Sequence, residues 1–205
     1  CKVWLVNVAT GKRKRLFKGD YKVARIEDKT FPKLAWHPTS QLLTWTFEEQ
    51  GRAYLGQYRL DEGKTTEKEL FRIDKVVDLS YADDGRRMVF AGVSEGQTDL
   101  YLYQVIGNNQ QRITNDPFDD LQPRFLPGTN KIIFTSNRPD DTLRVDVPVQ
   151  PIPDETDIFI LDLDRPGAVM EQVTNTDTES EHHPSAYDGK NYTFLSNRGG
   201  VHNRY

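Results

Sequence analysis

The chain has 205 residues, of which 27 are basic and 31 acidic, and its formal net charge is -4. This acidic surplus argues against a nucleic-acid partner, because neutralising phosphate groups requires an excess of basic side chains. A membrane-spanning helix needs about 20 consecutive apolar residues, whereas the longest tidy apolar runs, such as residues 3–6, contain four. We therefore expect a water-soluble globular segment without a membrane span.

The single cysteine, Cys1, has no partner for an internal disulfide bond or a structural zinc site. The redox compartment is therefore left open by the sequence. Cys1 at the first position is compatible with the lipid-bearing residue of a mature lipoprotein or with a truncation boundary. We favour the boundary, because a strand-like run begins at once, with no spacer after the cysteine.

A pattern of about twelve residues recurs along the chain. It contains two aromatic residues nine positions apart, with a polar turn between them. The full copies have Trp36 and Trp45, Tyr81 and Phe90, and Phe125 and Phe134, and a shortened copy at 184–194 has Ala186 in the first aromatic slot. The first slots lie 45, 44 and about 60 positions apart. Such a period is the signature of a repeat architecture.

Each copy is followed by a third strand-like run, a turn glycine and a short fourth strand. These third runs are rich in β-branched and aromatic residues, as half-buried strands require. They cover residues 3–8, 54–60, 99–105 and 157–163, and the glycines are Gly11, Gly63, Gly107 and Gly167. The segment 62–71, the best candidate for a helix, falls where a fourth strand belongs, so we interpret it as a turn and a strand.

Four short strands at this period predict an all-β fold, a β-propeller built of four-stranded antiparallel blades. In chain order, we expect an outer half-blade over 1–30, blades over 31–74, 75–116 and 117–177, and an inner half-blade over 178–205. The two half-blades either close a four-bladed ring or belong to a fragment of a larger propeller. We favour the fragment, because four blades is the lower limit of propeller size.

The repeat resembles that of TolB-type β-propellers, a six-bladed, WD40-like class. The opening motif is carried by residues 120–125 and 181–184, and the Asp-Gly turn by 83–86 and 188–190. The remaining motifs are Ser136-Asn137-Arg138 and Ser196-Asn197-Arg198, Asp99-Leu100-Tyr101 and Asp157-Ile158-Phe159, and Ile113-Thr114 and Val173-Thr174. The resemblance covers the whole chain, although the copy at 31–73 is degenerate.

The resemblance implies a non-catalytic interaction platform in the bacterial cell envelope or periplasm. Two alternatives stay open, since function depends on the sites that a fold carries. One is the gating propeller of a larger prolyl-oligopeptidase-like or tricorn-like serine peptidase, and the other is a propeller that binds a glycan or a small ligand. We expect no catalytic constellation within the chain itself, so peptidase activity would require a domain outside it.

One loop between a second and a third strand, at 139–156, is about fifteen residues longer than its counterparts and contains four prolines. Long loops are often functional, and proline lowers the entropy lost on binding. We expect this loop and the acidic loops before the first strands to share one face that binds a protein or peptide. The alternative is a variable loop that only covers the surface. The predicted contacts are Leu143, Arg144, Val145, Arg138, Arg198, Asp120 and Glu181.

The acidic loops, with Asp116, Asp119 and Asp120 in one and Asp177, Glu179 and Glu181 in the next, also offer oxygen ligands for calcium. We favour solvated loops without a cofactor, because charged side chains are usually exposed and no twelve-residue calcium loop is present. We expect no metal at His182 and His183 either, because adjacent strand residues point to opposite faces.

Two further motifs are given structural interpretations. Residues 92–96 match the Gly-x-Ser-x-Gly nucleophile motif, but a strand follows where that motif requires a helix, so we expect a turn and no catalytic Ser94. The basic run at 12–15 is expected on an outermost strand, where charged side chains discourage edge-to-edge pairing.

Overall fold

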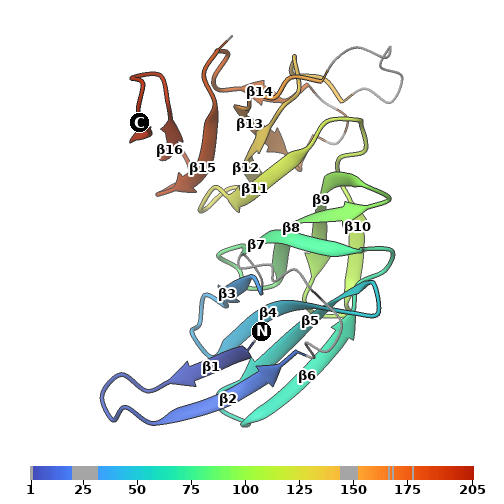
Figure 1. Ribbon diagram of the computed structural model, residues 1–205, viewed down its shortest axis with the longest axis vertical. Coiled ribbons are helices and arrows are strands. Elements are labelled where there is room, and N and C mark those ends of the chain that lie inside the picture. Colours follow the sequence, from blue (N-terminus) through green and yellow to red (C-terminus); the bar gives the residue numbers. More distant parts are fainter. Residues whose placement is uncertain (1, 20–31, 144–151, 166, 168, 177) are drawn as a thin grey trace.

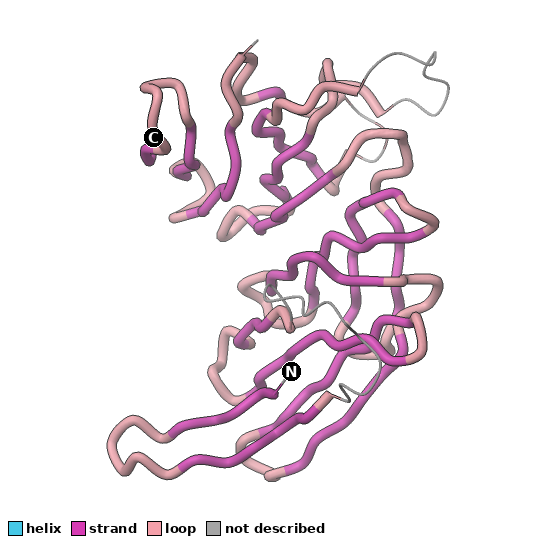
Figure 2. Tube along the Cα trace, in the orientation of Figure 1, coloured by secondary structure: helices cyan, strands magenta, loops and turns pink. Residues whose placement is uncertain are grey.

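The computed structural model describes residues 2–19, 32–143, 152–165, 167, 169–176 and 178–205. These residues form five antiparallel sheets and turns, without a helix (Figure 2). The sheets are β1 (Lys2–Val6) and β2 (Arg13–Lys18); β3 (Leu34–Trp36), β4 (Leu42–Glu49), β5 (Arg52–Arg59) and β6 (Lys64–Glu69); β7 (Lys75–Tyr81), β8 (Arg87–Ser94), β9 (Gln97–Gln104) and β10 (Asn109–Arg112). They continue with β11 (Asp120–Phe125), β12 (Lys131–Ser136), β13 (Asp157–Asp162) and β14 (Glu171–Gln172), and with β15 (Glu181–Ala186), β16 (Tyr192–Ser196) and β17 (Asn203–Arg204).

Every sheet is a meander in which consecutive strands pair with each other. Figure 1 shows the sheets following one another from the N-terminal to the C-terminal end, and the first strands β3, β7, β11 and β15 lie on the inner side of the curve. The first strands of neighbouring sheets also contact each other. This is the radial arrangement of propeller blades, and it confirms the predicted fold class.

The core lies in the seams between sheets. The second aromatic of each full repeat copy, Trp45, Phe90 or Phe134, is completely buried, and each belongs to a different apolar cluster. The first aromatics Tyr81 and Phe125 are buried as well, whereas Trp36 is half exposed. The repeated aromatics therefore fill the space between blades, as the sequence predicted, except at Trp36.

The two local predictions about turns are also confirmed. Residues 64–69 form the fourth strand β6, and no helix occurs there. Strand β8 ends at Ser94 and β9 begins at Gln97, so residues 95–96 form a tight turn between two strands. The strand, turn and helix that a nucleophile elbow requires are absent from this site. Residues 13–15 of the basic run lie on β2, which pairs only with β1 among the described strands.

A close backbone approach fixes the centre of the β3–β6 sheet. Trp45 on β4 pairs with Gly56 on β5, and the buried indole lies directly over the glycine. A Cβ atom at position 56 would lie 2.2 Å from Cε2 of Trp45. Only glycine allows this packing without displacing the ring.

We predict that Gly56→Ala lowers the free energy of unfolding by about 1–3 kcal/mol, the usual cost of overpacking a core. In a Trp45→Phe background the smaller ring leaves room for the new methyl group, so the same change should cost less. Urea unfolding of the four variants measures both costs. Equal costs in the two backgrounds would contradict the proposed contact.

Candidate functional site

Two kinds of loop meet at one edge of the sheets. The connections from each fourth strand to the next first strand and those from each second to third strand lie on this edge, which we call the loop face. Its described residues are 50–51, 70–74, 95–96, 113–119, 137–143, 152–156, 173–176, 178–180 and 197–202. The sequence-predicted contacts that the structure describes belong to this face or to the strand ends beneath it.

The loop face of the β11–β14 sheet is held by a buried ion pair. The Arg138 guanidinium donates to Asp120 Oδ1 at 2.6 Å and to Asp116 Oδ2 at 2.9 Å, and all three side chains are inaccessible to solvent. It also donates to Ser136 Oγ at 3.1 Å and to the carbonyl of Thr142 at 3.2 Å. One side chain therefore joins both strand ends and the start of the long loop.

Aromatic rings surround this guanidinium. The Arg138 Cζ atom lies between 5.7 and 5.9 Å from the ring centres of Phe118, Phe134 and Phe159. Burial raises the pKa of Asp120 more than the attraction of Arg138 lowers it. Its second oxygen, Oδ2, is buried without a hydrogen-bond partner among the described residues. The pair is thus desolvated, and its stability depends on both charges being present.

The same arrangement recurs in the β15–β17 sheet. Arg198 donates to Glu181 Oε1 at 3.1 Å and to Ser196 Oγ at 3.0 Å, while Ser196 Oγ donates to the same carboxylate at 2.6 Å. Burial alone raises the pKa of Glu181, but these bonds and one from Thr176 together hold it below its usual range. The arginine and serine of the Ser-Asn-Arg motif therefore form hydrogen bonds with the acidic residue at the start of the first strand. We call this arrangement, and the equivalent one around Arg138, a lock.

Another buried carboxylate lies close to the Arg138 ion pair, on the third strand β9 of the neighbouring sheet. The carboxylate of Asp99 on β9 is fully buried and accepts a hydrogen bond from Arg112, while Thr114 Oγ1 accepts from the backbone N–H of Leu100 at 2.9 Å. Burial raises the pKa of Asp99 to about 6 despite Arg112, and Asp120 and Asp116 add to the rise. The repeated Asp-Leu-Tyr and Ile-Thr motifs contain Asp99 and Thr114, but in the sequence the motifs indicated only the fold.

The preferred prediction of solvated acidic loops is wrong for Asp116, Asp120 and Glu181. All three carboxylates are buried, because the arginine of the same sheet compensates each charge and allows it to leave water. Asp119 and Glu179 are partly exposed, and Asp177 lies outside the described residues.

The predicted partner contacts occupy different environments. Arg138, Asp120 and Glu181 are buried in the locks and can influence a partner only by positioning the loops, whereas Arg198 is partly exposed. Leu143 is partly buried and packs against the apolar cluster between the β7–β10 and β11–β14 sheets. Arg144 and Val145 lie outside the described residues. The described start of the long loop bonds back to the sheet, since the N–H of Met170 donates to the carbonyl of Asp141 at 2.8 Å.

The expectation that His182 and His183 point to opposite faces is wrong. Their rings are 5.1 Å apart, and the His202 ring lies 4.9 Å from that of His182. A register shift occurs between His182 and Ser185, and His183 has a φ of 53°, so the alternation of the strand breaks here. No group of three His, Cys, Asp or Glu side chains among the described residues is arranged to hold a metal ion.

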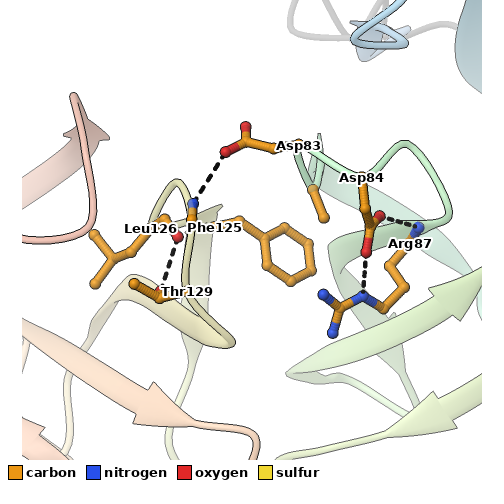
Figure 3. A pocket seen from close by; sticks show the side chains of 8 residues that line it. Asp83, Asp84, Arg87, Phe125, Leu126 and Thr129 are labelled. Carbon is orange, nitrogen blue, oxygen red and sulfur yellow. Dashed lines mark hydrogen bonds and ion pairs between the residues drawn. The ribbon is translucent and has the colours of Figure 1, made fainter.

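A small pocket of about 220 Å³ lies between the β7–β8 and β11–β12 turns (Figure 3). Its polar groups already bond within the protein. Asp83 accepts from the N–H of Gly128 at 3.2 Å, and Asp84 accepts from Arg87 Nε at 3.0 Å. The pocket therefore offers few free groups to a ligand.

A larger groove of about 500 Å³ lies between the β1–β2 hairpin and the next sheet. Its walls combine apolar side chains with the basic run that was predicted on an outer strand. They include Leu5, Val6, Trp36, Leu60, Lys12, Arg13 and Lys14. Lys14 donates to the hydroxyl of Tyr58 at 2.8 Å, so part of the basic run has a packing role. The sequence did not indicate that Trp36 and this run share one groove.

Comparison with known proteins places this geometry among propellers. Over 108 residues the chain is 31% identical to the Tol-Pal system protein TolB of Anaeromyxobacter dehalogenans (strain 2CP-C), and the match covers 52% of this chain and 24% of that protein. The crystal structure of TolB from Acinetobacter baumannii matches with a TM-score of 0.61 at 15% identity, over 99% of this chain and 47% of that one. A prolyl endopeptidase structure matches with a TM-score of 0.61 at 11% identity, over 96% of this chain and 29% of that one.

These matches confirm the resemblance to TolB-type β-propellers. No protein-family model matches the chain. The chain spans about half the length of the solved TolB that it matches, and its match covers about a quarter of the curated TolB. Among the described residues there is no helix long and apolar enough to cross a membrane.

We predict that Arg138→Ala lowers the free energy of unfolding by about 3–5 kcal/mol, because two buried carboxylates lose their counter-charge. The control is Arg165→Ala, which removes an exposed guanidinium 3.9 Å from Asp162 and should cost less than about 1 kcal/mol. Urea unfolding measures both. Similar costs for the two variants would show that the lock does not contribute to stability.

The raised pKa of Asp99 predicts a pH dependence. Between the ordinary value of 3.8 and the folded value of about 6, the folded state binds more protons at this carboxyl than the unfolded state. The contribution of Asp99 to stability therefore decreases as the pH rises from about 4 to about 6. Asp99→Asn should flatten this part of the curve of unfolding free energy against pH. An unchanged slope in the variant would refute the assignment.

Proposed function

We propose that this chain forms part of a non-catalytic TolB-like propeller that acts as a protein interaction platform in the bacterial cell envelope. The observation that carries the proposal is the 31% identity to a Tol-Pal system protein over 108 residues. The prolyl endopeptidase structure, by contrast, is only 11% identical to this chain and shares its fold alone. The sequence identity and the repeat motifs therefore favour the TolB-like function. A periplasmic or envelope location follows from the same resemblance.

The geometry supports a docking role for the loop face. The Arg138 and Arg198 locks tie loops to strand ends through charge-assisted bonds. Loops fixed in this way lose little conformational entropy on binding, which favours affinity for a protein partner. The described start of the long loop, residues 139–143, follows directly after Arg138, whose guanidinium donates to the carbonyl of Thr142.

The test replaces residues 144–151 by eight Gly and Ser residues and retains the contacts of Arg138 and Leu143. If the loop binds the partner, the variant should bind an envelope partner of the wild-type protein at least about tenfold more weakly in titration calorimetry. The control is Ile106→Ser, in the β9–β10 turn at the opposite edge of the sheet. Equal affinity for wild type and loop variant would remove the loop from the docking surface.

A substrate-gating propeller of a larger serine peptidase is a second candidate. It is favoured by the similarity in fold to a prolyl endopeptidase, of which this chain covers 29%. Chemistry in such a protein would require a hydrolase domain beyond these 205 residues. The full-length gene distinguishes the two candidates, because only the peptidase encodes such a domain.

A glycan- or small-ligand-binding propeller is a third candidate, and the groove beside Trp36 favours it. Its volume of about 500 Å³ is within the usual range for small-molecule sites. An exposed indole next to basic side chains suits a ligand with a flat apolar body and negative charge. Binding of an acidic oligosaccharide that Trp36→Ala abolishes would favour this candidate over the envelope platform.

A further inference from the structure

Phe71 departs from the repeat at a position that is buried in the neighbouring sheets. The N–H groups of Leu70, Ile113 and Val173 make equivalent bonds to the third strands of their sheets, at 2.8 to 2.9 Å. Phe71 therefore corresponds to Thr114 and Thr174. These threonines are 1% and 9% exposed, whereas Phe71 is 71% exposed.

A difference in backbone hydrogen bonding explains why position 71 does not need a threonine. In the other sheets the threonine hydroxyl accepts a hydrogen bond from the third strand, from Leu100 in one and Ile158 in the other, both at 2.9 Å. In the β3–β6 sheet the corresponding N–H, that of Ala53, donates to the carbonyl of the buried Ile73 at 2.9 Å. Position 71 no longer has to supply a polar side chain to the interior.

The exposed phenylalanine nevertheless has a fixed backbone. The side-chain amide of Gln110, on β10 of the next sheet, accepts from the N–H of Phe71 at 3.2 Å and donates to its carbonyl at 3.0 Å. Both polar groups of this peptide segment are thus held by one side chain from another blade. An aromatic presented in this way binds with little loss of backbone entropy.

Arg72 completes the exposed pair. Its φ of 53° is uncommon for a residue other than glycine, and its guanidinium carbon lies 5.2 Å from the centre of the Phe71 ring. Within the described part of the chain this guanidinium makes no other hydrogen bond or ion pair. Its N–H donors are therefore available for a bidentate bond to a carboxylate.

We propose that Phe71 and Arg72 form a binding hot spot for a partner protein that offers an apolar pocket bordered by an Asp or Glu side chain. The inference rests on the proposed interaction function and specifies the residues and chemistry of one contact. Interface energy is concentrated in a few buried aromatic and arginine side chains. Phe71 gains most by burial in an apolar pocket, and the free edge of Arg72 selects a carboxylate at its rim.

The first experiment places the photo-crosslinking residue p-benzoylphenylalanine at position 71 of the whole protein in its own cells. Position 106 is the control, because Ile106 is also highly exposed, at 81%, but lies at the opposite edge of the sheets. We expect a crosslinked partner peptide from position 71 only, with apolar residues close to Asp or Glu. A crosslink from position 71 to another segment of the same protein would overturn the inference.

The second experiment measures the affinity of the purified partner by calorimetry. Phe71→Ala should weaken binding by about 30-fold, as expected for a hot-spot side chain. Arg72→Asn introduces the residue found at the equivalent positions 115 and 175, tolerates the positive φ and removes the charge. We expect about a fivefold loss and a weaker dependence on salt, whereas Ile106→Ala should bind like the wild type.

The outcomes separate this inference from the proposed function. If the wild type binds its partner and Phe71→Ala binds equally well, the hot spot is wrong and the platform remains. If the wild type binds no envelope protein, both fail. Near-ultraviolet circular dichroism of each variant establishes that a loss of binding is not a loss of fold.

Discussion

The buried ion pair between Arg138 and the carboxylates of Asp116 and Asp120 determines how the loop face is built. A lone charge inside a protein is costly, so each partner can stay buried only because the other is present. The pair joins the start of β11, the end of β12 and the carbonyl of Thr142. The path of the chain from the β10–β11 loop into the long loop therefore follows from satisfying one guanidinium.

Variation of this network between sheets shows which parts are interchangeable. Asp99 and Arg112 pair across β9 and β10, and the corresponding positions of β5 and β6 have Arg52 and Glu69, which pair with the charges exchanged at 3.0 Å. The exchanged pair is exposed, whereas Asp99 is buried. Opposite charge across the third and fourth strands is thus retained, although only Asp99 of these four side chains is buried and has a threonine, Thr114, beside it. The β3–β6 sheet, which corresponds to the degenerate repeat copy, therefore has all four strands but an exposed ion pair in place of the buried one.

The sequence was sufficient for the fold but only partly for the site. The spacing of the aromatics predicted that Phe90 and Phe134 lie in the seams between sheets. Shifting a strand by one residue would turn its buried ring to the other face, so the repeated spacing also specifies the register of each hairpin. Burial of Asp120 and Glu181 was not predictable from composition, since it depends on an arginine about eighteen positions later folding back onto the first strand. The ring contact of His182 and His183 also escaped prediction, because a register shift breaks the strand alternation on which the expectation was based.

The buried network also changes the meaning of the net charge. The described interior contains four carboxylates, those of Asp99, Asp116, Asp120 and Glu181, but only one guanidinium, that of Arg138. With all of these groups ionised, the interior accounts for three of the four negative charges in the formal total of -4. The rest of the chain has a formal charge of -1, which is -4 minus the -3 of the interior. The basic groove beside Trp36 and the guanidinium stacked on Phe71 are local features of this nearly balanced part, and a few short-range contacts usually supply most of the binding energy of an interface.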